Sequence, residues 1–196
     1  MLCCSMLKLP RFPPSLRVLR FDLGVEEPFK ISNPWIWRTS EDVTLPLLEG
    51  LDISSSKYLT PEVLLRLMQP LHGRLTTFRI RQCIEIDGSC IKGLLRGGFL
   101  TNVTQFSLGE LIDLNDDVFE LIAATVLRLE SLITTGAAIT GVGVKALVER
   151  HADTLRFLRL DDCAAIGEDA IEYARAKGVE VRRRNRSGGG RSARRN

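Results

Sequence analysis

The sequence predicts an α/β fold: a right-handed solenoid, shaped as a short horseshoe, with a parallel sheet on its concave face and helices on its convex face. Three observations support this prediction. An apolar-x-x-apolar-x-apolar pattern recurs along the 196 residues. Most copies are followed by a stretch whose apolar residues have helical spacing. A unit of about 26 residues cannot bury its own apolar face, whereas stacked units share a continuous core.

Six full copies of the strand pattern define the predicted units. They begin at Leu16, Leu48, Leu75, Val103, Leu129 and Leu155, and a truncated seventh begins at Val179. The starts lie 32, 27, 28, 26, 26 and 24 residues apart, a spacing too regular for chance. We therefore predict an irregular segment over residues 1–14, a repeat domain over 15–181 with an insertion at about 22–45, and a tail over 182–196.

The second half of each unit also repeats. A small or apolar residue follows each strand at a fixed position, which holds Ser56, Cys83, Leu111, Ala137 and Cys163. Apolar residues with helical spacing come next, at about 63–67, 90–94, 118–122, 144–148 and 170–174. Thr60 before Pro61, and Asn115 before Asp116, are typical of helix N-termini. Each unit is therefore predicted to be a strand, a turn and a helix.

The geometry of such units predicts curvature. Consecutive strands joined by helices run parallel, and the crossover between them is right-handed. Strands in a sheet lie about 4.8 Å apart, while packed helices need roughly 8 to 10 Å. The stack therefore bends with its sheet on the inner side.

The unit from Leu155 to Ile171, together with residues 75–83 and Ile86, resembles the cysteine-containing leucine-rich repeat. The resemblance covers roughly residues 15–181, and it departs from the pattern where the cysteine position holds Ser56, Leu111 or Ala137. Repeats of this subclass are found in the substrate-recognition part of F-box proteins, the receptors of cullin-based ubiquitin ligases. The resemblance thus implies that a protein substrate binds the concave face.

An F-box would be a helical segment that opens with Leu-Pro and precedes the repeats. Only Leu9-Pro10 and Leu45-Pro46 are present, and neither precedes such helices. We therefore expect contact with a ubiquitin-ligase adaptor only if an F-box lies upstream. A stand-alone repeat scaffold without a ligase role is the alternative.

Composition excludes several other classes. No apolar run approaches about 18 residues, so no membrane span or membrane partner is expected. The five cysteines are odd in number and widely spaced, and neither they nor the two histidines show the spacing of zinc ligands. We expect no metal, no cofactor, and a reducing compartment, the cytoplasm or the nucleus.

Positive charge is concentrated at the C-terminus. From Arg182 onward there are seven arginines and no acid, which leaves −4 for the rest of a chain whose net charge is +3. The segment has no large apolar residue, so it is predicted to be disordered. Its first arginines, Arg182, Arg183, Arg184 and Arg186, are candidates for binding nucleic acid or for nuclear import. The alternative is a solvated extension without a partner.

One motif is typical of a nucleotide site. Gly141, Gly143 and Ala146 form a GxGxxA pattern, with Asp161 and Asp162 about 20 residues later. The repeat register explains the pattern better, because Gly143 falls in the turn that enters a helix. No arrangement of nucleophile, base and acid emerges either, and we predict that the chain is not an enzyme.

The residues that the repeat does not need are the candidates for binding. Side chains alternate along a strand, so those between the leucine positions line the concave face. The candidates there are Asp52, Arg79, Arg81, Gln105, Phe157, Arg159 and Asp161. Arginines on a rigid sheet can bind a carboxylate or phosphate with two hydrogen bonds. The alternative is that these are solvated charges that keep the sheet soluble.

Both tryptophans lie in the predicted insertion. Trp35 and Trp37 flank Ile36 between the first two units. They would serve either as an aromatic anchor for a partner or as a cap over the first unit. The sequence leaves both roles open.

Overall fold

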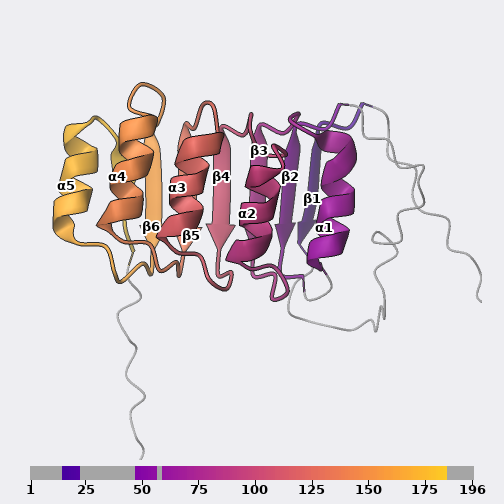
Figure 1. Cartoon of the computed structure of the whole chain (residues 1–196), viewed down its shortest axis with the longest axis horizontal. Helices are drawn as coiled ribbons and strands as arrows, with labels where there is room; N and C mark the ends of the chain where they lie inside the picture. The colour runs from indigo at the N-terminus through magenta and orange to yellow at the C-terminus, as the bar shows by residue number, and fades with distance from the viewer. Residues whose placement is uncertain (1–14, 23–46, 57–58, 185–196) are drawn as a thin grey trace, which may run out of the picture.

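The computed structural model describes residues 15–22, 47–56 and 59–184, and these form a seven-stranded parallel sheet whose strands follow chain order (Figure 1). The strands are β1 (Val18–Asp22), β2 (Gly50–Ser54), β3 (Thr77–Arg81), β4 (Gln105–Gly109), β5 (Ser131–Thr135), β6 (Phe157–Asp161) and β7 (Glu180–Arg182). The helices are α1 (Pro61–Met68), the 3-10 turn η2 (Gln69–Leu71), α2 (Gly88–Arg96), α3 (Asp116–Thr125), α4 (Gly141–Arg150) and α5 (Glu168–Ala176). This confirms the α/β class with a parallel sheet.

The helices form one layer against one face of the sheet (Figure 1). Strand side chains that point toward them are buried, including Leu51, Phe78, Phe106, Leu132 and Leu158, which the parallel register places side by side. The rings of Phe78 and Phe106 meet edge to face, with centroids 5.6 Å apart. The core is therefore shared between neighbouring units, as burial of an incomplete apolar face requires.

Each strand from β2 to β6 ends in the same turn. The residue after the strand has a positive φ of 53 to 69°, and this position holds Ser55, Gln82, Glu110, Gly136 and Asp162. Its N–H donates to the carbonyl of a residue in the next unit, as Gln82 does to Gly109 at 2.9 Å. The left-handed conformation strains a non-glycine residue, and this regular hydrogen bond helps to hold it.

At most α-helix starts a polar side chain accepts a hydrogen bond from a backbone N–H group of the first turn. Thr60 accepts a hydrogen bond from the N–H of Val63, and Asp87 accepts one from Cys90 at 2.8 Å. Asn115 is the N-cap of α3 through its backbone conformation. The helix starts predicted at Thr60 and Asn115 are thus confirmed.

The basic tail begins later than its charge predicts. Arg182 belongs to β7, and the N–H of Arg184 donates to Asp161 Oδ1 at 3.0 Å. The carbonyl of Arg184 in turn accepts from Asp162. Placing residues 182–184 in a disordered segment was therefore wrong, because β6 offers its edge and a carboxylate to them. Residues 1–14, most of the predicted insertion with Trp35 and Trp37, and the tail from residue 185 with Arg186 lie outside the described residues.

One core position departs from the apolar pattern. Thr134 on β5 stands where β3, β4 and β6 place Ile80, Leu108 and Leu160. Its side chain is fully buried, and its hydroxyl has no hydrogen-bond partner among the described residues. A buried hydroxyl without a partner lowers stability.

We therefore predict that Thr134→Val raises the free energy of unfolding by about 1 kcal/mol, because it replaces an unpaired buried hydroxyl with a methyl group of similar size. Urea denaturation monitored by circular dichroism measures the change. Thr135→Val, next along the strand on the opposite face, serves as the control and should stay within about 0.5 kcal/mol of the parent. Destabilisation by Thr134→Val would contradict the assignment of an unpaired hydroxyl.

Candidate functional site

The sheet face opposite the helices, called here the open face, carries the predicted binding residues. The strand register places equivalent residues of neighbouring units side by side. Asp52 lies between Arg20 and Arg79, Arg81 lies between Ser54 and Gly109, and Gln105 lies beside Thr77. Backbone pairing between the strands fixes the position of each of these residues relative to its neighbours.

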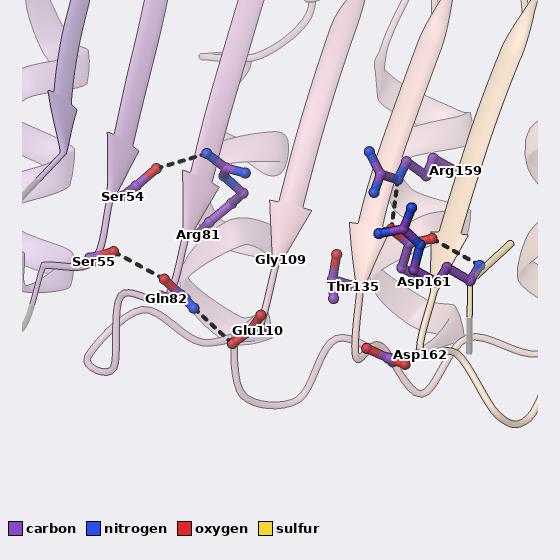
Figure 2. Close-up of a pocket in the computed structure, with 11 residues that line it drawn as sticks. Ser54, Ser55, Arg81, Gln82, Gly109, Glu110, Thr135, Arg159, Asp161 and Asp162 are labelled. Carbon is purple, nitrogen blue, oxygen red and sulfur yellow. Dashed lines mark hydrogen bonds and ion pairs between the residues drawn. The ribbon is translucent and has the colours of Figure 1, made fainter. Parts of the chain in front are cut away.

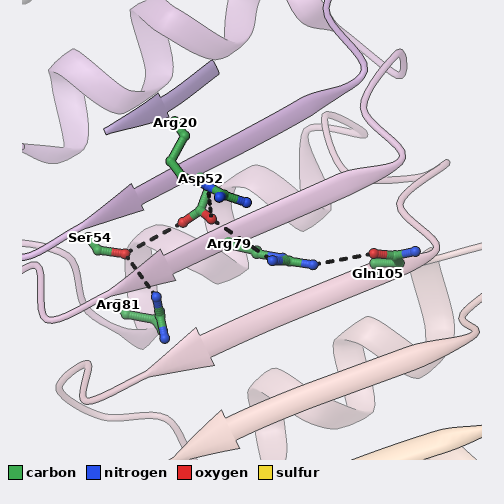
Figure 3. Close-up of polar contacts among 6 residues, drawn as sticks. All are labelled: Arg20, Asp52, Ser54, Arg79, Arg81 and Gln105. Carbon is green, nitrogen blue, oxygen red and sulfur yellow. Dashed lines mark hydrogen bonds and ion pairs between the residues drawn. The ribbon is translucent and has the colours of Figure 1, made fainter. Parts of the chain in front are cut away.

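Asp52 is the centre of one polar network on this face (Figure 3). Only 6% of the residue is exposed, although it points away from the helices. Its Oδ2 accepts from Arg20 Nε at 3.1 Å, and Arg79 Nη1 lies 4.0 Å away on the other side. Because a buried carboxylate needs compensating charge, the two flanking arginines stabilise it.

The network continues along β3 and β4. Arg79 Nη2 donates to Gln105 Oε1 at 3.4 Å, and Arg81 Nη2 donates to Ser54 Oγ at 3.4 Å (Figure 3). Both distances are long for hydrogen bonds, so these contacts are weak. The arginine heads can therefore turn toward another partner at small cost.

A second network lies at β6 and β7. Arg159 Nε donates to Asp161 Oδ2 at 2.6 Å, while the backbone N–H of Arg184 donates to Asp161 Oδ1 at 3.0 Å. Both oxygens of this buried carboxylate are thus engaged. The guanidinium of Arg182 lies over the ring of Phe157, 5.3 Å from its centroid, in a cation–π contact.

Between the two networks the open face is hollowed (Figure 2). The hollow has a volume of about 330 Å³, and Gly109 and Thr135 lie on the strands at its centre. Arg81 stands on one side and Arg159 on the other. Along its turn edge, Ser55 Oγ donates to Gln82 Oε1 at 3.0 Å, and Gln82 Nε2 donates to Glu110 Oε2 at 3.0 Å.

The structure brings most predicted residues into these two groups. Asp52, Arg79, Arg81 and Gln105 form one, and the pair Arg159–Asp161 joins the other. Sequence reasoning missed the turn residues Ser55, Gln82 and Glu110, which follow the strands. The signal for them was a polar residue immediately after most strands.

At the GxGxxA motif the backbone N–H groups already donate to a carboxylate of the same chain. Asp116 Oδ1 accepts from the N–H groups of Thr140 and Gly143 at 2.8 and 3.2 Å, and its Oδ2 accepts from the Thr140 hydroxyl at 2.6 Å. A Cβ on Gly143 would lie 2.6 Å from that carboxylate. A carboxylate from the neighbouring unit thus takes the hydrogen bonds that a phosphate would take, so the repeat explains these glycines.

The cysteines of the repeat are structural. Cys83 and Cys163 are fully buried, and each thiol lies near the carbonyl oxygen of the strand residue two positions earlier. Burial raises the pKa of both thiols and, with Asp87 and Glu62 adding to it, raises the pKa of Cys90 to about 11. These thiols are poor nucleophiles at neutral pH.

The described residues show no group of His, Cys, Asp and Glu suited to a metal ion. Among them, no helix has both the length and the apolar character that crossing a membrane requires.

Comparison with known proteins supports the fold alone. No protein-family model matches the chain, and no curated protein matches it. Its structure is similar to a chain in the crystal structure of the Rad7 and Elc1 complex in yeast, with a TM-score of 0.50 and 18% sequence identity. The match covers 67% of this chain and 35% of that chain, so this chain spans about a third of the length of the one it matches.

His151 gives the structure a titratable group outside the candidate site. Its side chain is buried at the end of α4, and Nε2 has no partner among the described residues. Burial and, to a lesser degree, the positive charge of Arg150 lower its pKa. A helix C-terminus favours a cation, but desolvation outweighs that effect at His151.

We predict that acid destabilises the fold through His151. Its pKa is lower in the folded chain than the ordinary value of 6.5, so the unfolded chain binds the proton more readily. The stability that neutral His151 confers is present above about pH 6.5 and is lost as pH falls from there toward the folded pKa. Between pH 7.5 and 5.5 the His151→Gln variant should lose less stability than the parent in urea denaturation.

The control is His72→Gln, because His72 is exposed. Comparison with this variant shows whether the acid loss is specific to the buried histidine. Equal acid losses in the parent and in His151→Gln would show that His151 does not titrate on unfolding.

Proposed function

We propose that this chain is a protein-binding module of the leucine-rich repeat type, which holds a target protein on the open face. One observation carries the proposal: the open face presents arginines, an amide and a phenylalanine on strands whose register is fixed, with a hollow between them. Arginine and aromatic side chains on a rigid support are frequent anchors of protein interfaces.

The repeat itself supports the leucine-rich assignment. The strand pattern, the buried position after the strand and the following helix recur through the described units. Strand order equals chain order, as stacked units require. The structurally similar chain belongs to a complex of two proteins, which is in keeping with a binding role.

Rigidity favours binding to this surface. The backbone of each strand from β2 to β6 pairs on both sides, so a target would not have to order it. Binding then loses less conformational entropy than it would with a flexible loop.

We further propose that the module is the target-binding part of an F-box-type ubiquitin-ligase receptor, acting in the cytoplasm or the nucleus. This step depends on the resemblance of residues 155–171 to the cysteine-containing repeat. In such a receptor this chain performs no chemistry. It holds the target at a fixed distance from enzymes carried by other subunits.

A photo-crosslinking experiment tests the binding face. Benzophenone-alanine at Gln105, exposed on the open face, should cross-link a target protein in cell extract, whereas the same probe at Glu120, exposed on α3 of the same unit, should not. Arg79→Ala with Arg159→Ala should reduce the cross-linked target at least 30-fold, the loss expected from truncating arginine anchors worth about 2 kcal/mol.

The matched control carries Arg66→Ala with Arg96→Ala, two exposed arginines of α1 and α2. It should keep the cross-link of the parent. Equal cross-linking from Gln105 and Glu120, or cross-links only to RNA, would overturn the proposed binding face.

The ligase role has a separate test. Protein expressed from the complete transcript should co-purify with a cullin adaptor, and Arg79→Ala with Arg159→Ala should remove the target while the adaptor stays bound. Recovery of the target without any adaptor would favour the stand-alone scaffold. Quantitative mass spectrometry of the purified complex measures both proteins at once.

A further inference from the structure

We propose that the hollow over Gly109 and Thr135 binds one acidic side chain, Asp or Glu, of an extended target segment, with Arg81 and Arg159 as its two hydrogen-bond donors. The inference rests on the proposed protein-binding function and specifies the chemistry of its partner. It concerns a single carboxylate on a peptide.

The shape of the hollow follows from one row of residues. From β2 to β6 the row reads Ser54, Arg81, Gly109, Thr135 and Asp161. Gly109 and Thr135 are two small neighbours in this row, with Arg81 beside them on β3 and Arg159, from the next row, beside them on β6 (Figure 2). A Cβ on Gly109 would lie 3.2 Å from Cγ of Arg81 and 3.6 Å from Cβ of Thr135, so any larger residue would fill this floor.

Both arginines keep donors for a ligand. Among the described residues, the Arg81 guanidinium makes one hydrogen bond, the 3.4 Å contact from Nη2 to Ser54. Arg159 donates only Nε, to Asp161, which leaves its two terminal nitrogens without a partner in the described part of the chain. A guanidinium offers five N–H donors, so Arg159 can donate to a carboxylate without giving up its bond to Asp161. Arg81 would give up only its weak contact with Ser54.

The spacing suits a group held between them. Arg81 and Arg159 lie on strands separated by three strand intervals, about 14 Å. The Arg81 guanidinium points toward Ser54 on β2, and its long 3.4 Å contact there lets it turn across β3 toward Gly109 and Thr135 at small cost. Arg159 stands on the other side of these two residues. A carboxylate above Gly109 and Thr135 would then lie between the two arginines.

Charge balance favours a carboxylate over a polyanion. The lining carries three arginines, Arg81, Arg159 and Arg184, and three acids, Glu110, Asp161 and Asp162. Asp161 is already engaged by Arg159 and the N–H of Arg184. The formal charge of the lining is therefore zero, which gives no extended positive stripe for nucleic acid but leaves local donors for one negative group.

The test titrates the full-length, ¹⁵N-labelled chain with the uncharged-flank peptide acetyl-Ala-Thr-Glu-Thr-Ala-amide and follows amide and arginine Nε signals by NMR. The signals of Gly109, Thr135, Arg81 and Arg159 should shift, and the same peptide with Gln in place of Glu should bind at least tenfold more weakly. Since one charge is involved, log Kd should change with log salt concentration by a slope of about 1 or less.

Two glycine variants give a matched pair. Gly109→Val fills the hollow and should lose peptide binding at least tenfold. Gly50→Val adds the same side chain to the same sheet face, where a Cβ would lie 3.2 Å from Val18, and should keep the affinity of the parent. A melting curve for each variant confirms folding, and Arg81→Gln, which leaves the backbone unchanged, repeats the test if Gly109→Val does not fold.

Because the tail is basic, a further full-length variant carries Arg186→Gln, Arg191→Gln, Arg194→Gln and Arg195→Gln. It should bind the Glu peptide as the parent does. Equal binding of the Glu and Gln peptides, shifts confined to tail signals, or equal losses in Gly109→Val and Gly50→Val would overturn the inference. So would preferential binding of a phosphoserine peptide or of single-stranded RNA.

The outcome is separable from that of the proposed function. If the open face still cross-links a target from Gln105 while the Glu peptide does not bind, only the acidic-ligand inference fails. If neither experiment gives a signal at the open face, the protein-binding proposal fails with it.

Discussion

The structure depends on an interior that no single unit can make alone. A five-residue strand and the short helix that follows it expose apolar side chains on every side that faces a neighbour, and stacking removes these from water. This requirement fixes the register, because a slip of one residue would turn Leu51, Phe78 and Phe106 out of the core. The same register sets the rows of the open face, so the arrangement of its side chains is a consequence of core packing.

The turn after each strand carries a second, backbone constraint. Non-glycine residues hold a left-handed conformation at Ser55, Gln82, Glu110 and Asp162, which is strained unless other interactions compensate. The hydrogen bond to the next unit is repeated at every one of these turns and provides that compensation. It also aims polar side chains along one edge of the hollow. The turns that join neighbouring units by this hydrogen bond therefore also form the edge of the candidate site.

Much of this architecture could be predicted from the sequence because its cause is periodic. The spacing of leucines gave the strands, their parallel order and the rows that place Asp52 beside Arg79. Features that occur in a single unit and break the repeat pattern were not predictable. The burial of His151, the unpaired hydroxyl of Thr134 and the ordering of Arg184 by Asp161 depend on particular neighbours. The hollow belongs to the same class, since it depends on which side chains surround Gly109 and Thr135.

The arginines of the open face fall into two groups according to the carboxylate contacts that they already make. Arg20 and Arg79 flank a carboxylate that is almost fully buried, and removing both charges would leave Asp52 uncompensated. Arg20 is the nearer partner, at 3.1 Å against 4.0 Å, so Arg79 is the one that can turn to a target. Arg81 has no carboxylate partner among the described residues, and Arg159 meets one with a single nitrogen. Guanidinium N–H groups without a partner are most useful to a ligand where the neighbouring side chains are too short to cover the sheet. On β4 and β5 these neighbours are Gly109 and Thr135. The distribution of small residues, more than the number of charges, therefore decides which part of the sheet is suited to a ligand.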